Sequence, residues 1–418
     1  MEDGGPIFLY DAPDKIPHGW PGCGECILSI ARLNDTSDKY LKTFTRDEQG
    51  GNPVQILNQT KPVDFPSTIW KNGDHWNFIG QGSRFTTKDK SFRSWTRVDD
   101  AFPGGHENGG QWWIPVPNQV SGAPPPAGSP NYMVNCGGGT TYRIGNYFPE
   151  NESFVWDGTS VANLEHGQAG WWGAQGGAAN NNRMMLIGWV SDFHGDAGPG
   201  INFLTRLTIL REANWDVKTQ SLVSNPVPEL LGLRSGSLAS EKVTLPTAAT
   251  PHVVAQTGGG AAASSDTVLT FSGFSTSAPL TTVYACVLGN GTVGSGVGIQ
   301  VQVVPGPNGT HTANIAAGAC PVPHTAAALE ALSAAQPIQL FDEAEVTVRV
   351  LADRSVADWF VQGGRWAATS AWPGSTPRQP ADSSIIVWSS APRVTAQVDV
   401  YGMGCGWLNP AYTENPTL

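Results

Sequence analysis

The sequence predicts an all-β protein made of two domains, and three observations lead to that prediction. The chain has 418 residues with 50 Gly and 32 Pro, which supply many tight turns. Its apolar stretches are short and are bounded by turn-forming residues. A helical pattern stands out in one segment alone, the Ala/Leu/Glu-rich run over residues 325–336. The remainder is therefore expected to form short strands joined by turns.

Strand-like runs follow one another from residue 7 to about residue 230. Three examples lie at residues 6–10, 76–80 and 185–190. The spacing of the turn signals between such runs is typical of propeller blades or of a sandwich. The run over 184–190 is apolar almost throughout, which predicts a strand buried on both faces.

The composition changes after Leu233-Arg234. Residues 257–265 are rich in Gly, Ala and Ser and predict a flexible surface loop. Further strands are then expected over 268–271, 299–303 and 345–350, of which the last two alternate apolar and polar side chains as half-buried strands do. We place the domain boundary near residue 234. The predicted domains are residues 1–234 and a β-sandwich over residues 235–418.

The charge balance narrows the classes of partner. The chain carries 24 Lys and Arg against 35 Asp and Glu, a net charge of −11, which argues against a nucleic acid or an anionic membrane surface. No run of about 18 apolar residues is present to span a membrane. Cys23-Gly-Glu-Cys26 lacks a second cysteine pair at zinc-site spacing, and the histidines are scattered. We therefore predict neither a metal nor a cofactor.

Cysteines and glycosylation motifs point to a secretory history. Five N-x-[ST] motifs occur, at Asn34, Asn58, Asn151, Asn290 and Asn308. Of the six cysteines, Cys286 and Cys320 lie in strand-like sequence and are expected to pair. The first residues contain no basic region followed by an apolar core, so no signal peptide is recognised. Either the protein is cytosolic or its true start lies upstream of Met1.

Several motifs resemble one known family when taken in order. They are Ala31 to Pro53, Lys88-Asp89 with Trp95, Tyr142 to Gly145, Arg183 to Val190, Asn225 to Leu230, and Asp353 to Phe360 with Trp372-Pro373. Together they resemble glycoside hydrolase family 32, the invertases, fructan hydrolases and fructosyltransferases. The resemblance implies a five-bladed β-propeller, here with its first blade incomplete or missing, followed by a β-sandwich. It also implies a sucrose- or fructan-type carbohydrate as partner and a secreted or vacuolar location.

The family's chemistry uses three acidic residues, and this sequence departs from all three motifs. A retaining glycosidase needs two carboxyl groups about 5–5.5 Å apart, one as nucleophile and one as acid/base. The nucleophile motif is not found, and only Asp3 faintly echoes it. The slot of the second Asp reads Asp64-Phe65-Pro66, with Phe65 at the acidic position. Asp64 lies one residue away, which on a strand is the opposite face.

The slot of the acid/base Glu is also occupied by an aromatic residue. It reads Gln111-Trp112-Trp113-Ile114-Pro115, with Trp113 where the acid belongs. An indole does not donate a catalytic proton near neutral pH. Glu107 lies six residues upstream, in a Gly-rich segment, and is the nearest relocated candidate.

Three hypotheses follow. The first is an invertase-like protein that is degenerate or incomplete, keeping the fold and binding a glycan. Its sugar-binding candidates are Asp64, Gln111, Trp112 and Trp113, because indole faces stack on sugar rings. The second is an active β-fructofuranosidase with relocated acids at Asp3, Asp64 and Glu107. The third is a structural or interaction protein.

Overall fold

A computed structural model describes most of the chain. The described residues are 7–13, 26–37, 42–46, 54–57, 69–80, 83–98, 113–137, 141–158, 162–167, 171–179, 183–191, 205–247, 250–255, 263–274, 280–306, 310–322, 325–333, 335, 337–371 and 384–404. The chain divides into two compact units. The first comprises Met1–Asn118, Ala123–Asn163 and Trp172–Met184, and the second comprises Gln119–Gly122, Leu164–Trp171 and Met185–Leu418.

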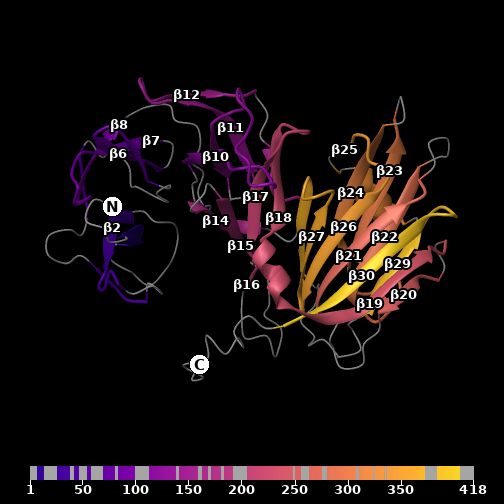
Figure 1. Cartoon of the computed structure of the whole chain (residues 1–418). Coiled ribbons are helices and arrows are strands. Elements are labelled where there is room, and N and C mark those ends of the chain that lie inside the picture. Colours follow the sequence, from indigo (N-terminus) through magenta and orange to yellow (C-terminus); the bar gives the residue numbers. More distant parts are fainter. Residues whose placement is uncertain are drawn as a thin grey trace. The chain divides into compact units, whose positions relative to one another are not determined.

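Short-stranded sheets make up the first unit (Figure 1). One has the order β1 (Ile7–Pro13), β2 (Cys26–Leu33), β3 (Phe44–Arg46). A second has the order β4 (Gln55–Leu57), β8 (Ser94–Val98), β7 (Ser83–Thr87), β6 (His75–Gly80), β5 (Trp70–Asn72), with β4 parallel to β8. A third has the order β12 (Ser153–Trp156), β11 (Thr141–Phe148), β10 (Tyr132–Gly137), β9 (Trp113–Pro115), and β13 (Ala162–Asn163) pairs with β11.

A fourth sheet corrects one expectation. Its order is β14 (Trp171–Ala179), β15 (Arg183–Ser191), β17 (Arg211–Asp216), β18 (Ser221–Pro226), and β16 (Thr205–Leu207) pairs with β15. The strand expected over 184–190 is present in β15. The expectation that both faces of this strand are buried was wrong. Met184, Leu186 and Val190 are buried, whereas Met185 and Ile187 are only partly buried. The run is apolar without being enclosed.

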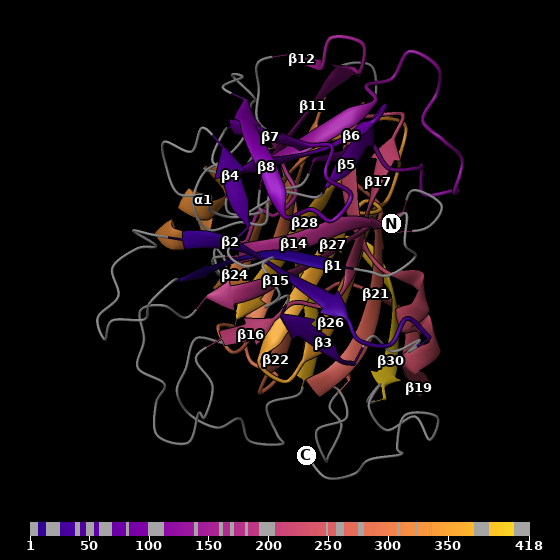
Figure 2. The same ribbon diagram turned by 90° about the vertical axis from the view of Figure 1, so that its left-hand side faces the viewer.

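Two six-stranded sheets form the sandwich in the second unit. The first has the order β19 (Arg234–Thr244), β30 (Thr395–Met403), β21 (Ser264–Ser272), β26 (Val346–Asp353), β27 (Val356–Val361), β28 (Trp366–Ala371). The second has the order β20 (His252–Ala255), β29 (Ser384–Ser389), β22 (Thr281–Gly289), β23 (Val297–Pro305), β24 (His311–Ala319), β25 (Ile338–Leu340). Figure 2 shows β19, β30, β21 and β26 from the side.

One continuous core fills the space between these two sheets. Leu269 and Val348 from one sheet and Val283 and Ile299 from the other belong to the same buried cluster. The strands carry the alternation that such packing requires, as in β26, where Val346, Val348 and Val350 are buried. Strand β19 begins at Arg234, and the boundary near residue 234 stays a prediction.

Other sequence expectations have mixed outcomes. The expected helix is present as α1 (Ala326–Ser333), and a 3-10 helix, η2 (Pro228–Leu233), precedes β19. The expectation of a loop over residues 257–265 was wrong for the last two of these residues. Ser264 and Ser265 open β21, and Ser265 is fully buried because it pairs with Ala352 on one side and Gly402 on the other.

The predicted disulfide is confirmed. Cys286 on β22 and Cys320, just after β24, are bonded with their Cα atoms 5.5 Å apart. Gly298 on β23 lies in register with Cys286. A Cβ atom added at Gly298 would lie 2.6 Å from the Cys286 sulfur and 2.8 Å from Cδ of Pro321. The bridge therefore occupies the space that a side chain at position 298 would need.

Candidate functional site

The sequence-predicted site residues lie almost entirely outside the described part of the chain. This holds for Asp3, Asp64, Phe65, Glu107, Gln111 and Trp112. The backbone of Trp113 opens β9, an edge strand of its sheet, opposite Val134 of β10. The structure therefore neither brings these candidates together nor separates them, and their roles stay predictions.

The Lys88-Asp89 motif with Trp95 builds a turn. The Asp89 carboxylate accepts hydrogen bonds from the backbone N–H groups of Ser91 at 2.8 Å and Arg93 at 3.0 Å. Burial acts to raise the pKa of Asp89, and these hydrogen bonds outweigh it, so the pKa lies below its ordinary value. The buried indole of Trp95 donates to the Phe92 carbonyl at 2.9 Å. The motif thus shapes the connection between β7 and β8.

Glu152 joins two sheets of the first unit. It lies in the turn between β11 and β12 with φ of 52°, a left-handed backbone conformation. One carboxylate oxygen accepts hydrogen bonds from the side chains of Asn72 at 2.9 Å and Asn77 at 3.3 Å, and lies 2.6 Å from Nε2 of His75. The other oxygen pairs with Arg84 of β7.

This set of partners explains both the strain and the charge of Glu152. Burial acts to raise its pKa, but the hydrogen bonds and the Arg84 charge outweigh that effect and lower it. A carboxylate with both oxygens engaged has little capacity left for substrate. Glu152 therefore acts as a structural anchor, holding its hairpin against the β5–β7 strands.

Arg211 is the centre of a second, fully buried ion cluster. Its guanidinium lies at the start of β17 and donates to Glu165 at 2.8 Å and to Asp358 at 2.5 Å. It also donates to the Thr369 hydroxyl at 2.6 Å, which in turn donates to Asp358 at 2.8 Å. All three ionised side chains are at most 2% exposed. The cluster thus fastens the fourth sheet to β27 and β28.

Backbone N–H groups complete the coordination of both carboxylates. Glu165 accepts from Thr369 at 2.6 Å and from Gly167 at 2.8 Å, and Asp358 accepts from Ile209 at 3.3 Å. Burial raises the pKa of Glu165, and the negative charge of Asp358, which shares the Arg211 guanidinium, acts in the same direction. These acids are enclosed and hydrogen-bonded, which suits architecture rather than catalysis.

Sequence reasoning found only part of this cluster. Asp358 lies in the motif over Asp353 to Phe360 that was recognised from the sequence. Glu165 and Arg211 were missed, because neither lies in a recognised motif. One signal was available: a buried strand that opens with Arg211 requires counter-charges elsewhere in the chain.

Among the described residues, no group of three or more His, Cys, Asp or Glu side chains is placed to hold a metal ion. No helix in the described part of the chain has the length and apolar character needed to cross a membrane.

Solved structures with the same architecture define the class of protein. Fructan 1-exohydrolase IIa from Cichorium intybus aligns with a TM-score of 0.71 at 17% identity, covering 97% of this chain and 82% of that one. A variant of that enzyme in complex with 1-kestose gives 0.69 at 18% identity, over 96% and 82%. Exo-inulinase from Aspergillus awamori gives 0.63 at 15% identity, over 96% and 80%. The class is thus a β-propeller followed by a β-sandwich.

Part of the sequence also matches the model of a known family. The family model for the glycosyl hydrolases family 32 N-terminal domain matches residues 29–226. Residues 29–226 thus match glycoside hydrolase family 32, and the resemblance seen in the motifs of the chain is confirmed. Comparison with curated proteins yields no match.

Proposed function

We propose that this chain is an invertase-type, carbohydrate-active protein of sucrose and fructan type that binds sugar without cleaving it by the family's three-acid mechanism. The observation that carries the proposal is the pair of aromatic residues, Phe65 and Trp113, in the acidic slots. Neither ring supplies a carboxylate, and losing members of a catalytic set costs several orders of magnitude in rate.

Sugar binding is proposed for the same region. Indole rings bury the C–H faces of sugars, and Trp112 and Trp113 are adjacent in the sequence, with Asp64 and Gln111 as hydrogen-bonding candidates. The complex of a structural neighbour with 1-kestose supports a fructose-containing ligand. Trp113 lies on an edge strand, and the edge strands of propeller blades include those that border the central channel.

The experiment measures turnover and binding on the same purified full-length chain. Sucrose, 1-kestose and inulin are incubated with it and released fructose is quantified. We expect no fructose above the no-protein control. Calorimetric titration with 1-kestose is expected to show saturable binding that Trp113→Ala abolishes. Trp156→Ala, at a partly exposed tryptophan of β12, is the matched control.

Two results would overturn the proposal in different ways. Turnover that is lost on Asp64→Asn, Glu107→Gln or Asp3→Asn would identify an active glycosidase with relocated acids. Absence of binding to all three sugars by a chain with an intact thermal unfolding transition would favour a structural or interaction protein.

We also propose that the protein passes through the secretory pathway and is glycosylated. The Cys286–Cys320 bond supports this, because disulfides persist in oxidising compartments. The described glycosylation motifs support it too, since Asn34, Asn151 and Asn290 are exposed. A mass decrease on enzymatic deglycosylation of protein from its native source is expected, and an unchanged mass would contradict glycosylation.

A further inference from the structure

The sandwich contains a pocket of about 170 Å³ lined by residues of both sheets. Its apolar wall comprises Phe274, Val303, Leu340, Ala344 and Val346. Its polar lining comprises His311, Asp342, Glu343 and Glu345. A cavity of this size accommodates about six non-hydrogen atoms of an apolar guest. The pocket therefore combines a small apolar chamber with acidic side chains.

Two buried polar atoms of this lining lack a hydrogen-bond partner among the described residues. One is Nε2 of His311, a residue only 8% exposed, which lies in register with Leu340. The other is Oε2 of Glu343. A carboxylate oxygen only accepts hydrogen bonds, and Nε2 accepts in the tautomer protonated at Nδ1. In that tautomer both atoms are acceptors that lack a donor, and a buried acceptor without a donor is costly.

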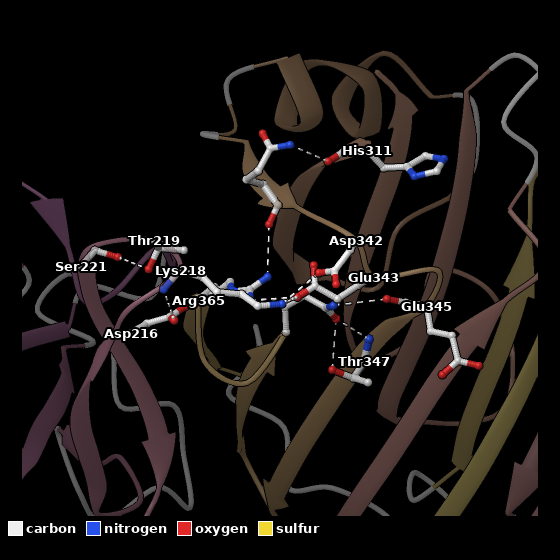
Figure 3. Close-up of polar contacts among 12 residues, drawn as sticks. Asp216, Lys218, Thr219, Ser221, His311, Asp342, Glu343, Glu345, Thr347 and Arg365 are labelled. Atoms are coloured by element: carbon white, nitrogen blue, oxygen red, sulfur yellow. Dashed lines mark hydrogen bonds and ion pairs between the residues drawn. The ribbon is translucent and has the colours of Figure 1, made fainter. Parts of the chain in front are cut away.

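The surrounding charges are unbalanced. Lys218 pairs with Asp342 at 2.9 Å and with Glu343 at 3.2 Å, and Arg365 pairs with Glu343 at 2.9 Å and with Asp216 at 3.2 Å (Figure 3). Two cations thus pair with three carboxylates, those of Asp216, Asp342 and Glu343. Glu345, which also lines the pocket, adds a fourth carboxylate. The Lys218 hydrogen bond lowers the pKa of Asp342, which is therefore ionised at neutral pH. The pocket carries excess negative charge.

We propose that this pocket binds a small organic ammonium ion, namely a primary alkylamine. Its –NH₃⁺ group supplies three donors, enough for His311 and Glu343, and its charge offsets the acidic excess. Its alkyl chain lies against Phe274 and Leu340, where burial of apolar surface contributes affinity. An anion is repelled by the carboxylates, and a neutral alcohol leaves the charge uncompensated.

The test is a calorimetric titration of the full-length chain with n-pentylamine. Two further probes separate the contributions: n-pentanol has the same chain without the charge, and ammonium chloride has the charge without the chain. We expect saturable binding of n-pentylamine, with both other probes weaker by about tenfold or more, as expected for a lost charge-assisted hydrogen bond or lost apolar burial.

Variants assign the binding to this pocket. His311→Leu removes the acceptor while keeping an apolar wall, and Glu345→Gln removes one rim charge. We expect the dissociation constant for n-pentylamine to rise about tenfold in His311→Leu and by a smaller factor in Glu345→Gln. Glu330→Gln, on α1 and also exposed, is the matched control and is expected to leave binding unchanged. Thermal unfolding verifies that each variant is folded.

Three outcomes would overturn the proposal. The first is equal affinity for n-pentylamine and n-pentanol. The second is n-pentylamine binding that folded His311→Leu and Glu345→Gln leave unchanged. The third is no saturable binding of n-pentylamine to the wild-type chain.

Discussion

The two arginine-centred ion clusters join different pairs of sheets and differ in their exposure to solvent. In the first unit, Arg84 and Glu152 have side chains that are 9% and 17% exposed, and Glu152 also has amide and imidazole partners. In the second unit, Arg211 is fully buried and shared between Glu165 and Asp358. One cluster has substitutes for its cation, whereas the other depends on a single guanidinium. Removing a charged partner should therefore lower the free energy of unfolding by different amounts in the two clusters.

The largest expected effect comes from Arg211→Met. It leaves Glu165 and Asp358 buried without a counter-charge, which is expected to lower the free energy of unfolding by about 3–5 kcal/mol. Urea unfolding followed by tryptophan fluorescence measures this, since Trp359, Trp366 and Trp388 are buried in the same unit. Adding Glu165→Gln and Asp358→Asn to Arg211→Met should recover part of the loss. A loss below about 1 kcal/mol would show that the cluster contributes no more than a surface ion pair.

A smaller effect is expected from Glu152→Gln. The amide keeps one acceptor for the asparagines but loses the charge that Arg84 and His75 contact, so we expect a loss of about 1–2 kcal/mol. The same urea experiment measures it. Glu150→Gln, at an exposed position of the same turn, is the control and should not change stability. A Glu152→Gln effect as large as that of Arg211→Met would remove the distinction between the clusters.

The free energy of unfolding should depend on pH in opposite directions for the two clusters, because the pKa of Glu152 is lowered and that of Glu165 is raised. The pKa of Glu152 is lowered on folding, so its contribution is present above the unfolded value of 4.5 and is lost as pH falls through the folded pKa. The pKa of Glu165 is raised, so its protonation favours the folded state at low pH and that benefit is lost as pH rises through the folded pKa.

The measurement is the free energy of unfolding between about pH 7 and pH 3. Glu152→Gln should flatten the loss of stability on acidification, and Glu165→Gln should steepen it. Identical slopes in both variants and the wild type would show that neither carboxylate titrates differently in the folded state.

The sequence predicted the fold better than it predicted the charged contacts. Apolar alternation in β26 and the Ala/Leu/Glu run of α1 are local patterns, so they report local structure directly. The family motifs supplied the order of the two domains. In the buried cluster, Arg211 is 46 positions from Glu165 and 147 positions from Asp358 in the sequence. No local pattern encodes such distant contacts.

Burial was harder to predict than strand position. The run over 184–190 is apolar but only alternately buried, whereas β22 contains Thr281 and Thr282 and is buried throughout. A strand's exposure depends on what covers its sheet, which its own residues do not specify. The candidate sugar site was named from aligned motif slots, and its residues other than Trp113 lie outside the described part of the chain.

The glycine beneath the disulfide constrains how this sequence can change over time. Any larger residue at position 298 meets the Cys286 sulfur and Pro321, so it must displace a covalent bond that closes a separation of 34 residues. A descendant lineage can therefore diversify position 298 only after it has lost both the disulfide and the ring of Pro321, which lies 2.8 Å from the same Cβ position. Geometry thus sets the order of those mutational steps. A substitution at position 298 that comes first gives a protein in which the new side chain overlaps the disulfide.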